Sequence, residues 1–271
     1  SRNIKTTFLV REELFWDNVL PKQEAKMISD HIKSHGIDLR LETDLKEIMS
    51  DGSGRVRAVI TGDGEEISCQ FLGLTPGVHP NIDLAKHSGI NVDKGILVNE
   101  FMETETADVY AIGDCAQRKE PVPGRGPIEQ VWYTGRMMGE TLAQTICGNK
   151  IAYAPGPWFN SAKFFDIEYQ TYGRVGNELK ESEAEFYWKH SEENIALHCV
   201  MDKENNTFKG INTFGMRMRH EIFDQWIKNN VSLDYVISNL ELANFDPEFF
   251  AKYESQIIEA YVKQFPGANV E

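Results

Sequence analysis

Apolar and polar positions alternate in short runs through the first part of the chain. The run 6–11, rich in β-branched and apolar residues, predicts a strand. Pro21 then opens a predicted helix over 22–34, whose apolar residues share one broad face. Gly36 suits the end of that helix, and 37–41 predicts a second strand. A strand, a helix and a strand at this spacing predict a βαβ unit with two parallel strands.

Antiparallel strands are expected on both sides of the middle of the chain. The pattern predicts a meander with glycine-rich turns from three strands, at 46–49, 56–60 and 66–69. It predicts a small antiparallel sheet from four later strands, at 163–172, 185–190, 195–200 and 208–214. Three helices follow that sheet, at 221–228, 233–240 and 247–265, the second with Ser232 as its N-cap.

Two short apolar runs lie on either side of an acidic turn in the middle of the chain. Residues 96–99 predict one strand, and 109–112 predict a second that stops at Gly113 and Asp114. Such runs fit strands buried in a parallel sheet, and ligands bind at the carboxyl ends of these strands. Gly113 lets a ligand approach the backbone, and Asp114 can accept hydrogen bonds from sugar or polyol hydroxyls. An ordinary turn is the alternative for a Gly-Asp pair alone.

The residues around this turn resemble the second flavin-binding signature of the FAD-dependent pyridine nucleotide (disulfide) oxidoreductases. The matching positions are Thr106, Tyr110, Ala111, Gly113, Asp114 and Ala116. The upstream segments Gly-Val-His-Pro-Asn at 77–81 and Ser-Gly-Ile at 88–90 resemble two further elements of that family. The resemblance implies that Gly77, Gly113 and Asp114 contribute to an FAD site, with Asp114 holding a ribityl hydroxyl.

A loop rich in proline and glycine follows, and a helix is predicted over 129–147. Its apolar positions, which include Met138, Leu142, Ala143 and Ile146, are expected to pack against the sheet. In the family the start of this helix faces the pyrimidine edge of the flavin. The resemblance therefore adds four residues to the predicted FAD site, Glu129, Gln130, Val131 and Trp132. A core position under the loop is the alternative for Trp132.

The segment 157–161, Pro-Trp-Phe-Asn-Ser, resembles the entry to the C-terminal domain of ferredoxin-reductase-type flavoproteins. In those proteins the aromatic pair lies near the flavin ring, so Trp158 is also assigned to the cofactor site. An interdomain plug is its alternative role.

The resemblance also predicts how the chain is divided. It implies an α/β fold in which 1–67 form the second half of a nicotinamide-nucleotide domain and 68–150 the C-terminal half of an FAD domain, both with parallel sheets. Residues 151–271 are expected to form a C-terminal α+β domain of the interface or dimerisation type. The chain contains no Gly-x-Gly-x-x-Gly sequence, and both such motifs of the family would lie upstream of Ser1. We therefore expect a C-terminal portion of a longer enzyme.

The implied activity is the passage of a hydride from NAD(P)H to FAD and of electrons onward to a protein carrier or another redox centre. The branch indicated is the ferredoxin-, rubredoxin- and nitrite-reductase-like one, because no redox dithiol is present. In the family the position after the first strand reads the adenosine ribose, and the candidates for it here are Arg11 and Glu12. They favour opposite cofactors, so NAD(H) and NADP(H) stay open. Catalytic residues are unassigned. A catalytically inactive scaffold or dimerisation module is the alternative function.

The composition excludes some classes of binding partner. The formal net charge of −14 argues against nucleic acid and against an anionic membrane surface. Four cysteines without a Cys-x-x-Cys pair fit a reducing, cytoplasmic setting. A homodimer through 151–271 is expected from the family. His31 and His35 are four apart on one predicted helix, but no third ligand is evident in the sequence, so no metal site is expected.

Overall fold

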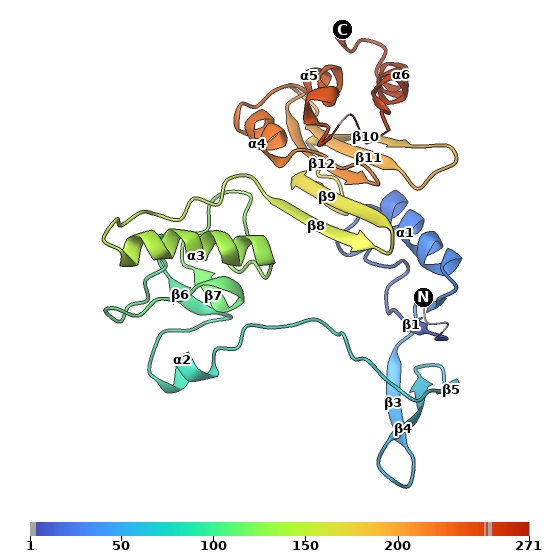
Figure 1. Cartoon of the computed structure of the whole chain (residues 1–271), viewed down its shortest axis with the longest axis vertical. Helices are drawn as coiled ribbons and strands as arrows, with labels where there is room; N and C mark the ends of the chain where they lie inside the picture. Colours follow the sequence, from blue (N-terminus) through green and yellow to red (C-terminus); the bar gives the residue numbers. More distant parts are fainter. Residues whose placement is uncertain (1–3, 247, 249–250, 271) are drawn as a thin grey trace. The chain divides into compact units, whose positions relative to one another are not determined.

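The computed structural model describes residues 4–246, 248 and 251–270. The chain forms two compact units, one made of Ser1–Thr75 together with Ser161–Glu271 and the other of Pro76–Asn160 (Figure 1). This division joins the first and last parts of the chain, which the sequence analysis assigned to different domains. The three-domain assignment stays a prediction. The mixed α/β class, with parallel strand pairs and a separate antiparallel sheet, is confirmed.

The larger unit begins with the expected βαβ unit. The strands β1 (Thr7–Leu9) and β2 (Asp38–Arg40) pair in parallel, and α1 (Lys22–Ser34) connects them. Just beyond α1, Gly36 has a φ of 76°, in the left-handed region that residues following a helix often adopt. The predicted bounds of this helix are confirmed.

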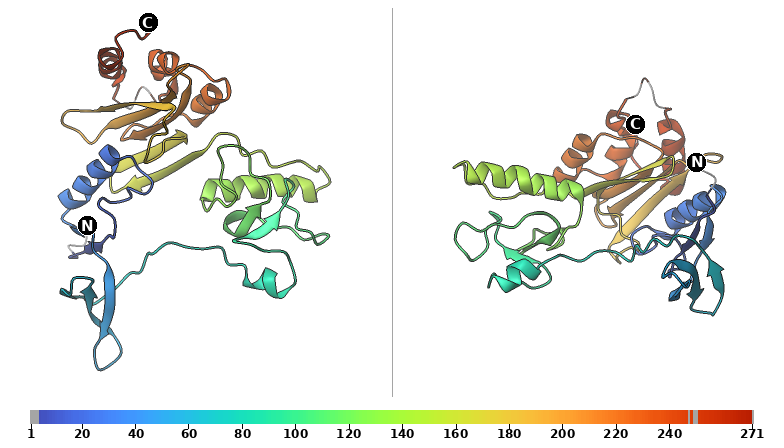
Figure 2. Two further views of the ribbon diagram at one scale, coloured as in Figure 1. Left: turned by 180° about the vertical axis from the view of Figure 1, so that it is seen from behind. Right: turned by 60° about the horizontal axis from the view of Figure 1, so that its bottom comes forward.

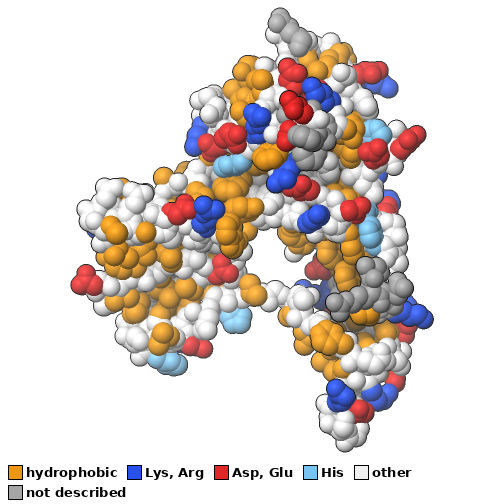
Figure 3. Space-filling view, in the orientation of Figure 1, with side chains coloured by type: hydrophobic (Ala, Val, Ile, Leu, Met, Phe, Trp, Pro, Cys, Tyr) orange, Lys and Arg blue, Asp and Glu red, His pale blue; other side chains and the backbone are white. Residues whose placement is uncertain are grey.

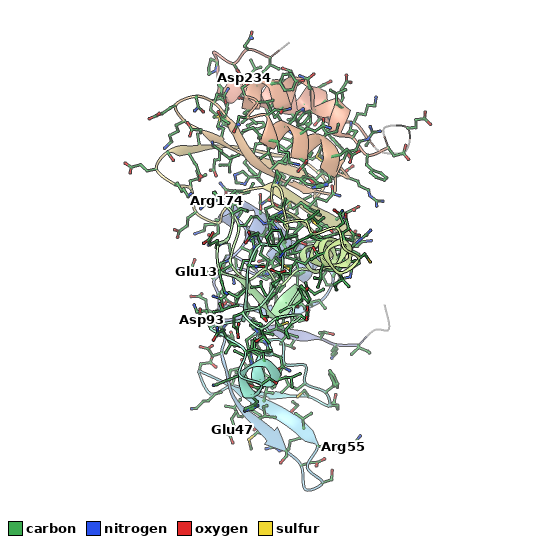
Figure 4. All side chains as sticks on the ribbon, turned by 90° about the vertical axis from the view of Figure 1, so that its left-hand side faces the viewer. Glu13, Glu47, Arg55, Asp93, Arg174 and Asp234 are labelled. Carbon is green, nitrogen blue, oxygen red and sulfur yellow. The ribbon has the colours of Figure 1, made fainter. Side chains whose placement is uncertain are left out.

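A three-stranded antiparallel meander follows. Its strands are β3 (Leu45–Ser50), β4 (Val56–Thr61) and β5 (Glu66–Ser68), as predicted. Asp51 shapes the first turn, because its Oδ1 accepts hydrogen bonds from the backbone N–H groups of Ser53 and Arg55 at 2.7 and 3.0 Å. Figure 4 shows Glu47 and Arg55 on this hairpin.

A five-stranded antiparallel sheet lies in the same unit, in the order β10-β11-β12-β9-β8. Its strands are β8 (Phe159–Phe164), β9 (Ile167–Gly173), β10 (Glu183–Lys189), β11 (Ala196–Asp202) and β12 (Phe208–Phe214). The single strand predicted at 163–172 is wrong, because a turn at Phe165 and Asp166 separates β8 from β9. Phe165 has a φ of 57°, and an apolar residue in that position hid the turn from the hydropathy pattern.

Helix α1 packs on this sheet and shares a core with it (Figures 1 and 2). The predicted apolar face of α1 is confirmed by the burial of Ala25, Met27, Ile28 and Ile32. These residues pack with residues of the sheet, Ile167, Tyr169, Ala196 and Phe214. Complete burial of a side chain such as Ile28 contributes about 1.5–3 kcal/mol, so this core ties the two ends of the chain together.

Three helices follow the sheet. They are α4 (His220–Lys228), α5 (Leu233–Ser238) and α6 (Glu254–Gln264). The Ser232 Oγ accepts a hydrogen bond from the Tyr235 N–H at 3.1 Å, which confirms the predicted N-cap. Helix α6 is shorter than the predicted 247–265, and Pro247, Phe249 and Phe250 of that prediction lie outside the described residues. No helix in the described ranges combines the length and apolar character that crossing a bilayer requires.

The smaller unit contains α2 (Asp83–His87), β6 (Ile96–Val98), β7 (Ala116–Arg118) and α3 (Trp132–Ile146). The strands β6 and β7 pair in parallel, and Figure 2 shows α3 alongside them. On α3, Met138 and Leu142 are buried as predicted, whereas Ala143 and Ile146 are exposed, contrary to the prediction. The reason is length, because a helix of 15 residues reaches well beyond strands of three residues.

The second strand predicted in this unit, at 109–112, is wrong. Tyr110 forms an isolated antiparallel bridge with Glu103, and the Ala111 N–H donates to the Met102 carbonyl at 3.1 Å. The acidic turn therefore folds back on itself, and the parallel partner of β6 is β7. Gly113 and Asp114 precede this parallel strand instead of following one.

Candidate functional site

The Gly-Asp pair lies in a short 3₁₀ turn, Gly113–Cys115, directly before β7. Gly113 has a φ of 74°, a left-handed conformation that side-chain-bearing residues rarely adopt, and no atom lies within 4 Å of a Cβ added there. Asp114 is exposed, so its carboxylate is open to a ligand. The turn thus offers an open backbone beside an acceptor group, although at the amino end of a strand.

The start of α3 is the second part of the site. Val131 is extended and makes no side-chain cap, and the Gly135 N–H donates to the Val131 carbonyl at 3.1 Å. The N–H groups of the turn before Gly135 have no acceptor within the helix, and the helix dipole places partial positive charge there. Trp132 is 68% exposed, so the alternative prediction that its side chain lies in the core under the loop is wrong. The Arg136 guanidinium lies over its ring, at 5.7 Å from the centroid.

Small residues bring the turn and the helix together. A Cβ added to Gly135 would lie 3.5 Å from the Gly113 Cα, so the two backbones are close. The Gly113 N–H also donates to the Met138 sulfur at 3.3 Å. Two predicted site segments that are about 18 positions apart in sequence, around Asp114 and Trp132, therefore share one region. Hydrophobic side chains are exposed over α3 in Figure 3.

Glu129 takes part in a buried ion-pair network that the sequence analysis missed. Its carboxylate accepts from Arg125 Nε at 2.6 Å and Arg125 Nη2 at 2.8 Å, and Arg118 Nη2 lies 3.6 Å from Oε1. All three side chains are only 4% exposed. The only sequence signal was the spacing of four between Arg125 and Glu129. Glu129 thus supports the loop before α3, and its predicted flavin contact stays a prediction.

Arg125 also fixes the segment that carries Trp158. Its Nη1 donates to the carbonyls of Pro155, Gly156 and Pro157 at 3.2, 3.0 and 3.4 Å. The guanidinium lies over the half-buried Trp158 ring, at 5.1 Å from the centroid. Trp158 is therefore held by the same network that holds the loop before α3.

The remaining predicted site residues are more isolated. Gln130 is exposed just before α3. Gly77 is exposed in the irregular segment 69–82 and has a φ of 96°, and the contacts of the described residues do not join it to Asp114. In the larger unit, the candidate ribose readers Arg11 and Glu12 pair with each other at 3.7 Å on the surface. This pairing leaves the choice of nucleotide open.

Comparison with families of known proteins finds one match. Residues 3–139 match the family described as pyridine nucleotide-disulphide oxidoreductase. This range covers the βαβ unit, the meander and the turn with Asp114.

Individual proteins are similar over ranges of different length. The NAD(P)H sulfur oxidoreductase (CoA-dependent) of Pyrococcus abyssi is 27% identical over 96% of this chain and 60% of its own. The rubredoxin-NAD(+) reductase of Acinetobacter baylyi is 35% identical over 48% of this chain and 32% of its own. A solved NAD-dependent persulfide reductase from A. fulgidus has the same fold, with a TM-score of 0.77 and 19% identity over 97% of this chain and 51% of its own. The matched ranges thus cover between 32% and 60% of the length of these relatives.

Proposed function

We propose that this chain, which belongs to the pyridine nucleotide-disulphide oxidoreductase family, is the C-terminal portion of an FAD-dependent NAD(P)H oxidoreductase. The enzyme would pass a hydride from NAD(P)H to FAD and electrons on to an acceptor. The observation that carries this proposal is the close approach of the Gly113 turn to the first turn of α3.

The residues of this region suit the polar parts of a flavin. An exposed carboxylate at Asp114 can accept hydrogen bonds from polyol hydroxyls, and the left-handed Gly113 keeps the backbone open beside it. The start of α3 presents N–H donors and partial positive potential, which suits a group that gains negative charge. FAD, when bound, accepts a hydride and passes its electrons on singly or in pairs. The residues of this chain would bind the flavin, orient it and shield it from water.

The electron acceptor has two candidates. A small redox protein is one, because the rubredoxin-NAD(+) reductase is 35% identical over 48% of this chain. A sulfur compound is the second candidate, because two of the relatives that match over nearly the whole chain are named as a sulfur oxidoreductase and a persulfide reductase. Parallel assays with a rubredoxin and with polysulfide separate the two. The use of NAD or of NADP, and the formation of a homodimer through 151–271, are also proposals.

The experiment that tests the function uses the protein expressed from its complete gene. We expect a yellow protein that oxidises NADH or NADPH, and much less flavin in the 271-residue chain alone. A complete protein without flavin would exclude the enzyme reading. A flavin-containing protein that oxidises neither nucleotide would favour the alternative of an inactive scaffold.

Asp114→Asn is expected to weaken FAD binding by the complete protein about 10–100-fold, because hydrogen bonds to charged groups contribute about 1.5–3 kcal/mol. The measurement is the flavin retained during dialysis, followed by absorbance. Asp83→Asn, an equally conservative change at an exposed position of α2, is the control and should retain flavin fully. Equal retention by both variants, with unchanged thermal unfolding, would remove Asp114 from the site.

A further inference from the structure

Three potential metal ligands converge where α1 meets the turn between β8 and β9. His31 Nε2 lies 2.8 Å from Asp166 Oδ1, and His35 Nε2 lies 3.4 Å from the same oxygen. All three ligand atoms lie within 4.8 Å of one another. The group is the only one of its kind among the described residues. Asp166 is 135 positions from His31, so the sequence could not reveal this third ligand.

The spacing suits a tetrahedral zinc ion. Zinc bonds of about 2.0–2.1 Å to nitrogen and oxygen imply ligand separations of about 3.3 Å. The distance from His35 to Asp166 already has this value, and the distance from His31 to Asp166 needs to widen by roughly half an ångström. Asp166 lies in an exposed turn with 76% of its side chain accessible, so small rearrangements there are easy.

Neighbouring groups orient both imidazole rings. His35 Nδ1 lies 3.0 Å from the His31 carbonyl, which requires a proton on Nδ1 and leaves the Nε2 lone pair for a metal. His31 Nδ1 lies 3.1 Å from the Asn194 side-chain amide. A rotated amide presents its oxygen to an Nδ1–H, which frees His31 Nε2 in the same way. The Phe165 ring stacks on His35 with centroids 4.3 Å apart.

We propose that His31, His35 and Asp166 bind a zinc ion, with a water molecule as the fourth ligand. Two histidines and one carboxylate with an open position are a common zinc ligand set. Binding displaces the proton that His31 and Asp166 share in the metal-free hydrogen bond. The ion would fasten α1 to the hairpin of β8 and β9, across the junction of the first and last parts of the chain. This site is independent of the proposed flavin function.

Zinc titration by calorimetry tests the site. The protein is the untagged 271-residue chain with Cys147→Ser, which removes an exposed thiol that could bind zinc, in a buffer without chelators. We expect one equivalent of zinc to bind and to raise the melting temperature. Asp166→Asn and His35→Gln should each weaken binding by about 10–100-fold or more, since loss even of a group that only orients a ligand costs this much.

Two comparisons make the result decisive. His87→Gln, a change at an exposed histidine of α2, should leave zinc affinity unchanged. Asn194→Ala should weaken zinc binding while the stoichiometry stays at one. Cobalt substitution should give the visible absorption of a tetrahedral ion, and Asp166→Asn should abolish it. Absence of stoichiometric binding, or equal affinity in the Asp166, His35 and His87 variants, would overturn the proposal.

Discussion

Glu129→Gln is expected to lower the free energy of unfolding by about 3–5 kcal/mol, because removal of one partner from a buried ion pair leaves charge uncompensated. Gln has nearly the same shape as Glu, so the change removes charge without opening a cavity. The buried guanidinium groups of Arg125 and Arg118 would then face a neutral amide. The measurement is urea unfolding followed by circular dichroism and by tryptophan fluorescence, to which Trp158 beside Arg125 contributes.

The chain contains a matched control for this experiment. Arg136 and Glu140 form an ion pair with the same spacing of four and a distance of 2.8 Å, but both side chains are exposed. Glu140→Gln should therefore leave stability almost unchanged, because water screens exposed pairs. Equal effects of the two Glu→Gln substitutions would show that burial of the Glu129 network does not matter for stability.

Stability is also expected to fall by about 3 kcal/mol as the pH rises from 6.5 to 9, because the unfolded chain releases the His198 proton at a lower pH than the folded protein does. His198 is buried, with Nδ1 at 2.9 Å from Glu24 Oε1 and Nε2 at 3.0 Å from Glu185 Oε2. Burial lowers the pKa of this imidazole, but the hydrogen bonds and charges of Glu185 and Glu24 outweigh it and raise the pKa to about 9.

The sign follows from the direction of that shift. A histidine whose pKa is raised by folding stabilises the protein fully below its ordinary pKa of 6.5, and this contribution disappears as the pH passes about 9. Burial raises the pKa of Glu24, so the ionisation of this carboxyl group also lowers stability as the pH rises. Hydrogen bonding to His198 lowers the pKa of Glu185, whose contribution is lost instead in acid.

His198→Gln should flatten the dependence of stability on pH between 6.5 and 9 and lower stability at pH 6.5. Urea unfolding at several pH values provides the measurement. His87→Gln changes an exposed histidine and should keep the wild-type slope. A slope that persists in the His198 variant would assign the titration to another group.

The sequence predicted those elements whose signals are local. The α1 helix has a proline at its start, a glycine beyond its end and one apolar face, and its predicted bounds are confirmed. Ser232 caps α5 as expected, because an N-cap depends only on the next few residues. The family was also indicated, because several short motifs occur at the right spacing around Asp114.

The features that were missed depend on long-range packing. The turn at Phe165 carries an apolar side chain because that ring stacks on His35, a residue from the other end of the chain. The 109–112 run bridges back to Glu103, which hydropathy does not encode. The burial of Arg118 and Arg125 follows from their contacts with Glu129, and a loop rich in proline and glycine gave no sign of it.

The core shared by α1 and the antiparallel sheet makes the larger unit discontinuous in sequence. Its N-terminal part is held by side-chain packing as well as by the covalent chain. The stretch 73–79 is exposed and has no regular structure, which is the kind of segment that proteases cut. A single cut there would leave two polypeptides that stay associated and elute together in gel filtration under native conditions. They would separate only when a denaturant unfolds the shared core.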